Sequence, residues 1–190
     1  NIIKNLPENE AQEYADLELS TQLKNMQKLV TGDFLNFVKY MWTEFIEGKH
    51  HRDISKKFND LSTGKINRLI VNMPPRHTKS EFASYFLPAW MIGKNPNLKI
   101  IQATHTADLA IDFGRKTKNL IDEEKYHEMF DTRLQEDSQA AGKWKTEQGG
   151  EYFAAGVGGA ITGRGADLLI IDDPHKEQDL KGDGSAFDKA

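Results

Sequence analysis

The sequence predicts an α/β fold in which helices flank a mostly parallel sheet, with a helical extension at the N-terminus. Residues 68–73 form a short and almost continuous apolar run, which is typical of a strand buried on both faces of such a sheet. Residues 167–172 form a second strong strand, and segments with helical spacing lie between the strands. Strands that alternate with helices in this way indicate right-handed βαβ units.

Helical patterns precede the first strand. We assign residues 1–32 to a polar arm with a peripheral helix, and residues 33–190 to one domain, since single domains usually contain about 100–200 residues. Asp33 is the predicted N-cap of a helix that runs to about residue 46 and ends at Gly48. A second amphipathic helix follows and ends at residues 62–64.

Further strands and helices are expected after the first strand, which Pro74 and Pro75 bring to an end. Gly93 and Pro96 separate the next helix from the strand that follows it. The remaining sequence predicts helices at residues 80–92, 106–121 and 123–130, and strands at residues 98–103 and 151–155.

Composition excludes several classes of protein. The formal net charge of −4 argues against a protein that coats nucleic acid, because such proteins usually carry a basic excess. The absence of Cys excludes disulfides and thiolate metal sites, and the six His residues lack the spacing of a zinc site. No stretch approaches the roughly 18 apolar residues that cross a bilayer, and the first residues lack a signal-peptide pattern. We therefore expect no membrane partner and a cytoplasmic location.

Residues 73–80 lie between a predicted strand and a predicted helix, where a P-loop binds phosphates through its backbone amides. Lys79 is expected to reach the β and γ phosphates, and the Ser80 hydroxyl to bind Mg²⁺. The standard pattern has Gly where this chain has Met73 and Thr78, so the alternative is a Lys-Ser pair that only opens a helix. The predicted phosphate-binding residues are Pro75, Arg76, His77, Thr78, Lys79 and Ser80.

Two carboxylates stand at the end of the last predicted strand, at the sheet edge where α/β proteins bind ligands. Asp172 is expected to hold Mg²⁺, directly or through water, and Asp173 to polarise a water that attacks the γ phosphate. The alternative is a strand that ends in a polar turn at Asp173-Pro174.

Other basic residues have more than one interpretation. Arg76 is either a γ-phosphate sensor or a structural residue. Arg164 lies in the glycine-rich segment 156–165 and is an arginine finger, a contact to DNA phosphates or half of a structural ion pair. Lys143-Trp144-Lys145 is either a contact to single-stranded nucleic acid or a surface segment with a buried ring.

These motifs resemble those of the large terminase subunits of tailed double-stranded DNA phages. Residues 68–81, Pro88-Ala89-Trp90 and residues 156–174 carry the resemblance, which spans about residues 34–176. It implies a P-loop NTPase of the ASCE (RecA-like) class that uses ATP and Mg²⁺. It also implies a homo-oligomeric ring that pulls double-stranded DNA into the procapsid, with the portal protein and the small terminase subunit as partners, in the host cytoplasm during phage infection.

The resemblance also assigns roles to single residues. Lys79 and Ser80 match the Walker A pair, and Arg76 matches the arginine characteristic of the terminase loop. Asp172 matches the Walker B aspartate and Asp173 the catalytic acid. Arg164 resembles the arginine that acts on a neighbouring subunit's nucleotide.

Two residues depart from the pattern of the family. Thr78 stands where Gly is usual, and its Cβ would be strained if the loop needs a positive φ. Asp173 is one methylene shorter than the usual Glu. The nuclease domain of the family is not expected in this sequence. The alternatives to a packaging ATPase are a nucleotide-binding or assembly module that does not hydrolyse ATP, and another P-loop translocase such as a helicase.

Overall fold

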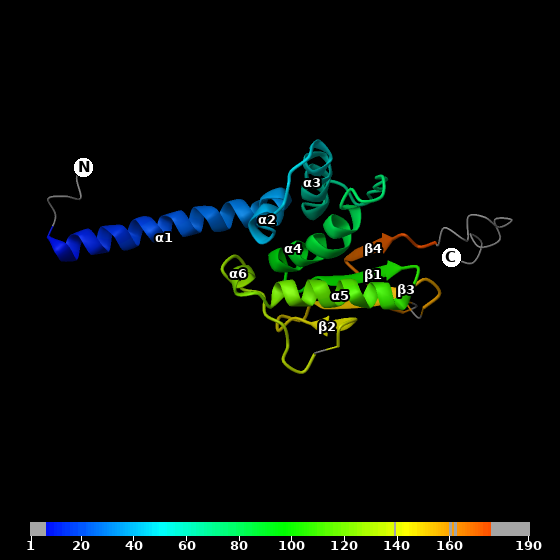
Figure 1. The fold of residues 1–190 in the computed structure, drawn as a ribbon. Coiled ribbons are helices and arrows are strands. Elements are labelled where there is room, and N and C mark those ends of the chain that lie inside the picture. Colours follow the sequence, from blue (N-terminus) through cyan, green and yellow to red (C-terminus); the bar gives the residue numbers. More distant parts are fainter. Residues whose placement is uncertain (1–6, 139, 160, 162, 176–190) are drawn as a thin grey trace.

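The computed structural model describes residues 7–138, 140–159, 161 and 163–175, and it confirms an α/β architecture (Figure 1). The helices are α1 (Glu8–Gly32), α2 (Phe34–Met41), α3 (Lys49–Ser62), α4 (Leu87–Lys94), α5 (Ala107–Ile121) and α6 (Glu124–His127), with a π-helix, η2 (Glu81–Phe86), directly before α4. The strands are β1 (Lys99–Thr104), β2 (Lys143–Lys145), β3 (Glu151–Gly156) and β4 (Leu168–Asp172).

The four strands form one sheet in the order β2-β3-β1-β4. β1 pairs in parallel with both β3 and β4, as the βαβ pattern predicts, whereas β2 pairs antiparallel with β3. The sheet is therefore mixed rather than parallel throughout. Only residues 146–150 connect β2 to β3, and a connection this short joins neighbouring strands as a hairpin, because a parallel crossover needs a dozen or more residues.

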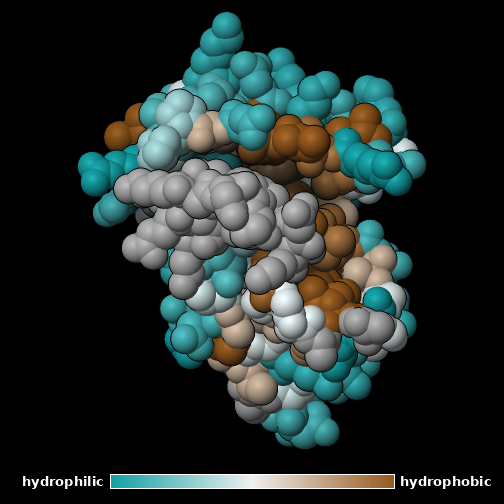
Figure 2. All heavy atoms as spheres, turned by 90° about the vertical axis from the view of Figure 1, so that its right-hand side faces the viewer, coloured by the Kyte–Doolittle hydropathy of each residue, from teal (hydrophilic) through white to brown (hydrophobic). Residues whose placement is uncertain are grey.

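One face of β4 is buried and the other is exposed. Leu168 and Ile170 join the hydrophobic core, which also holds the aromatic side chains of η2 and α4. Leu169 and Ile171 point to the opposite face of the sheet and are 55% and 60% exposed. Figure 2, which views the side of the molecule where β4 ends, shows apolar surface there.

The segment 68–73 is not a strand, so this prediction is wrong. A strand needs a hydrogen-bonded neighbour, and residues 68–73 do not pair with β4, although Leu69 and Val71 line a cavity of about 130 Å³ together with residues of that strand. Leu69 and Val71 pack against the core, whereas Ile70 between them is 88% exposed. The apolar run therefore reflects an extended segment with one side on the core.

The predicted helix after Asp33 is shorter than its apolar spacing suggested. The Asp33 side chain accepts a hydrogen bond from Asn36 N–H at 2.9 Å, which confirms the N-cap. The helix ends at Met41, because Trp42 takes an extended conformation and stacks its ring on Phe86. The aromatic residues after Met41, such as Trp42 and Phe45, are therefore positioned by contacts with other elements and not by a continuing helix.

The other predicted elements agree with the structure to within a few residues. α3, β1, α5, β3 and β4 lie where the sequence predicts them, and α6 is shorter than expected. The predicted peripheral helix is α1, which extends away from the rest of the molecule (Figure 1). No helix in the described part of the chain has the length and apolar character needed to cross a membrane.

Candidate functional site

The predicted phosphate loop borders a cavity of about 580 Å³, a volume within the range of small-molecule sites. Five of the six predicted phosphate-binding residues line it, and so does Asp173 from the end of β4; His77 is not among the lining residues. The complete lining consists of Met73, Pro74, Pro75, Arg76, Thr78, Lys79, Ser80, Glu81 and Asp173. Residues about 95 positions apart in the chain thus meet at one site.

Backbone strain is concentrated at this cavity. In the part of the chain that the structure describes, the non-glycine residues with positive φ are Arg76 (63°), Thr78 (62°) and Asp173 (44°). Such conformations are uncommon for residues other than Gly, and for a β-branched residue such as Thr78 they are outliers. Strained backbone clusters at functional sites, where the surrounding structure enforces it. The positive φ that would make Thr78 a strained substitute for Gly is present.

A helix begins directly after the loop. Phe82 N–H donates to the Thr78 carbonyl at 3.0 Å, and helical structure continues from residue 79 to residue 94 through η2 and α4. The first N–H groups of a helix have no partner within the helix, and the helix dipole favours negative charge at this end. The loop and the first turn therefore form a surface suited to an anion such as phosphate.

Lys79 connects the loop to both carboxylates. Its Nζ lies 3.1 Å from Asp172 Oδ1 and donates a hydrogen bond to Asp173. Burial of the ammonium opposes its charge, but the hydrogen bonds to Asp173 and Asp172 outweigh that effect and raise the pKa of Lys79 above its ordinary value. Lys79 is therefore a charged group held at the edge of the cavity by two negative partners.

Asp172 is buried, and a second hydrogen bond fixes its carboxylate. Ser84 in η2 donates to Asp172 Oδ2 at 2.8 Å, and neither residue is exposed. Sequence analysis missed Ser84, whose only signal is a small polar residue between the core positions Phe82 and Phe86. The Asp172 carboxylate is thus held by the Lys79 ammonium, from the start of the helix, and by the Ser84 hydroxyl, from its second turn.

Ser84→Ala is expected to lower the free energy of unfolding by about 1–3 kcal/mol, because it leaves a buried carboxylate oxygen without its donor. Urea denaturation measures this effect. Ser55→Ala is the matched control, since Ser55 is also buried but its hydroxyl has no hydrogen-bond partner. Equal losses in the two variants would show that the bond to Asp172 contributes nothing specific.

The residues predicted to bind metal suit Mg²⁺ by their chemistry. No group of three His, Cys, Asp or Glu residues within the described ranges could hold a metal ion. Mg²⁺ in nucleotide sites typically takes one or two protein oxygens and completes its coordination with water and phosphate. The hydroxyl of Ser80 and the carboxylate of Asp172 are oxygen ligands of that kind.

Arg76 and Arg164 occupy different ends of the sheet. Arg76 lines the cavity, so both its sensor role and its structural role remain predictions. Arg164 lies 3.0 Å from Glu151 Oε1, with its guanidinium 3.9 Å from the centre of the Phe153 ring. Glu151 begins β3, whereas Asp172 ends the parallel strand β4, so Arg164 is at the opposite edge of the sheet from Lys79. The ion pair fits the structural alternative, and a finger role would have to act on a second copy.

No protein-family model, curated protein or solved structure matches this chain. The assignment of the site therefore rests on its geometry and on the motifs of the sequence.

The triplet Lys143-Trp144-Lys145, the third basic candidate, contains a buried ring. Trp144 stacks on Tyr152 with ring centres 4.8 Å apart, and its Nε1 donates to the Gly114 carbonyl at 3.1 Å. Lys143 and Lys145 point outward on either side of it. The indole is therefore not free to stack on a nucleic-acid base, and the triplet is a surface strand with a core tryptophan.

Proposed function

We propose that this chain is a P-loop ATPase, the motor domain of a terminase large subunit that uses Mg-dependent ATP hydrolysis to move double-stranded DNA into a procapsid. One observation carries the proposal: Lys79 lies between a loop with positive φ angles and two carboxylates at the end of a parallel strand. The cavity brings together a cation, an anion-binding helix end and the carboxylate of Asp173, and the buried carboxylate of Asp172 contacts the same cation. Phosphoryl transfer to water requires parts of these kinds.

Each part has a chemical task. The N–H groups at the start of the helix donate hydrogen bonds to phosphate oxygens. The Lys79 ammonium exchanges its carboxylate partners for the β and γ phosphates. Ser80 and Asp172 would hold Mg²⁺, which when bound would neutralise negative charge on the phosphates. Asp173, 65% exposed, accepts a hydrogen bond from the attacking water, and Arg76 contacts the γ phosphate.

The wider role is part of the same proposal and depends on the terminase resemblance. It includes a homo-oligomeric ring, the portal protein and the small terminase subunit as partners, and the host cytoplasm as location. In such a ring, Arg164 would leave its ion pair with Glu151 and act on the nucleotide of a neighbouring copy.

A nucleotide-binding module without turnover is the second candidate. Both carboxylates bind Lys79, and Thr78 occupies a strained conformation in the loop, so binding could occur without the arrangement that hydrolysis needs. Binding and turnover must therefore be measured separately.

Lys79→Ala is expected to abolish Mg-ATP binding, measured by titration calorimetry, because it removes the positive charge that faces the phosphates. Lys65→Ala is the matched control: Lys65 pairs with Asp60 at 2.9 Å, neither residue lines the cavity, and its loss should leave binding unchanged. A thermal melt confirms that both variants are folded. Absence of binding by the unmodified chain, or full binding by Lys79→Ala, would contradict the proposed site.

A further inference from the structure

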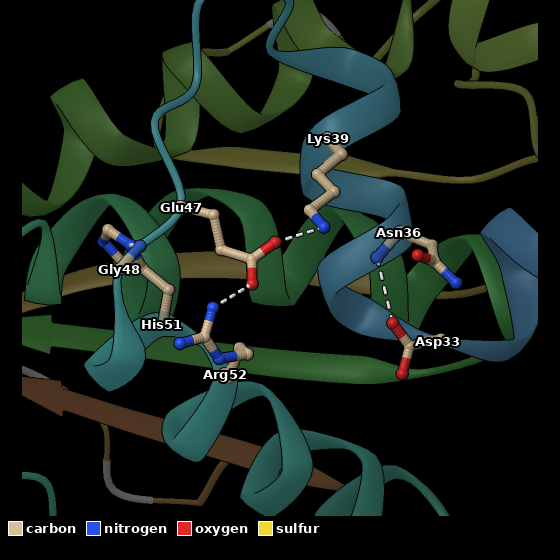
Figure 3. Close-up of polar contacts among 7 residues, drawn as sticks. All are labelled: Asp33, Asn36, Lys39, Glu47, Gly48, His51 and Arg52. Atoms are coloured by element: carbon tan, nitrogen blue, oxygen red, sulfur yellow. Dashed lines mark hydrogen bonds and ion pairs between the residues drawn. The ribbon is translucent and has the colours of Figure 1, made fainter.

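His51, in the first turn of α3, makes two ring hydrogen bonds, one to the N-cap of its own helix and one to the phosphate loop. The ring is buried and 5% exposed. Gly48 N–H donates to Nδ1 at 2.8 Å, and Nε2 lies 2.7 Å from the Thr78 hydroxyl oxygen. Figure 3 shows His51 beside Gly48 at the start of α3. The imidazole therefore bridges a helix N-terminus and a strained residue of the loop.

The contacts decide which ring nitrogen carries the proton. Because Nδ1 accepts a hydrogen bond from Gly48 N–H, its lone pair must be free, and a neutral ring then has its proton on Nε2. Nε2–H donates to the Thr78 hydroxyl, which in turn donates to the His77 carbonyl at 2.6 Å. These groups form a directed chain of hydrogen bonds that ends on the backbone of the loop.

Packing holds the ring in this position. His51 stacks on Phe82 with ring centres 4.8 Å apart and contacts the Phe45 ring at 4.7 Å. At the other end, a Cβ on residue 48 would lie 2.8 Å from Cε1 of His50, so a larger residue there would displace the His50 ring. The hydrogen-bond donor of His51 is therefore aimed at Thr78 by groups on three sides.

The surroundings also keep the ring neutral. Burial is the largest effect that lowers the pKa of His51, and His50 and His77 lower it further, whereas Glu47 raises it. Glu47 is engaged by Lys39 and by Arg52, whose Nη1 lies 2.6 Å from it (Figure 3). A second proton on the ring would sit on Nδ1 and face the Gly48 N–H, so this contact disfavours the charged ring.

We propose that His51 is a positioning residue, whose Nε2–H holds Thr78 in the left-handed conformation that a glycine adopts freely in a phosphate loop. A non-glycine residue in this conformation is strained, and the hydrogen bond from a buried donor offsets that strain. The inference rests on the proposed function, since it assigns His51 to the ATP site. It also explains how Thr78 can stand at a position that favours Gly.

Three variants test this inference. His51→Phe keeps a ring between Phe45 and Phe82 but removes both hydrogen bonds, and its dissociation constant for Mg-ATP is expected to rise about tenfold, equal to about 1.4 kcal/mol. His51→Gln restores a donor toward Thr78 and should recover most of the affinity. In a Thr78→Gly background, where no support is needed, His51→Phe should change the constant less than about twofold.

Other results would overturn the inference. A tenfold loss that persists in the Thr78→Gly background shows that His51 only stabilises the fold, and unchanged binding by His51→Phe shows that Thr78 needs no support. Nitrogen NMR of the His51 ring tests the contact without nucleotide: a neutral ring protonated on Nε2 at mildly alkaline pH is expected, and protonation on Nδ1 contradicts it. If the unmodified chain binds no ATP, the proposed function fails, while the NMR result still decides the contact.

Discussion

Asp173→Asn is expected to reduce ATP turnover by about 10²–10⁴-fold while ATP binding stays as strong as in the unmodified chain or becomes stronger. The amide cannot accept a proton from the attacking water. It also competes less for Lys79, which donates to Asp173 in this structure, so the ammonium is freer to meet the phosphates. Asn tolerates the left-handed conformation of residue 173 (φ 44°) better than most residues, so the backbone should be unchanged.

Phosphate release and titration calorimetry, performed on the same preparation, separate the two effects. Asp112→Asn is the matched control, because Asp112 is also an exposed aspartate in an ion pair, with Arg115 at 2.8 Å on α5. Turnover that survives Asp173→Asn would remove Asp173 from the chemistry. Loss of binding together with turnover would instead make Asp173 a structural partner of Lys79.

Phe34→Ala is expected to lower the free energy of unfolding by about 3–5 kcal/mol, the largest stability loss that we predict. Phe34 has no exposed surface, and edge-to-face contacts join its ring to Phe58, Phe82 and Trp90 at 5.0, 5.4 and 5.6 Å between centres. Truncation therefore leaves a cavity between α2, α3, η2 and α4, and also removes the aromatic contacts.

Urea denaturation followed by tryptophan fluorescence measures this loss. Leu29→Ala is the matched control, because Leu29 is a large apolar residue near the end of α1 but is 63% exposed, and a change within about 0.5 kcal/mol is expected there. A similar loss of stability for both variants would mean that the contacts of Phe34 with Phe58, Phe82 and Trp90 do not contribute more to stability than an exposed leucine does.

Local patterns predicted the elements that depend on local chemistry. Asp33 caps α2 as predicted. The helix predicted from apolar spacing at residues 106–121 is α5, and the apolar run that ends at Asp172 is β4. The sequence also predicted that Lys79, Asp172 and Asp173 share one site, because ligands bind at the carboxyl edge of such a sheet. It did not predict the ion pairs that join Lys79 to the two carboxylates.

Long-range contacts explain what the sequence did not predict. Residues 68–73 have the composition of a strand, but sheet pairing depends on where β4 lies. The roles of His51 and Ser84 arise only when α3 and β4 pack beside the loop, since their partners are 27 and 88 residues away. Arg164 lies between two glycines, as expected for an arginine finger, yet Glu151 and Phe153 bind it at the opposite edge of the sheet from Lys79.

Because Glu81–Phe86 form the π-helix η2, the number of residues between Lys79 and Trp90 is as important for the structure as their identity. Leu87 N–H donates to the Phe82 carbonyl, five residues earlier, so the segment holds more residues per turn than an α-helix. A single-residue deletion would let it close as an α-helix and rotate Lys79 by about 100° relative to Trp90. Lys79 and the core tryptophan could then not both keep their partners. Substitutions at exposed positions of η2 can be absorbed, whereas insertions and deletions cannot.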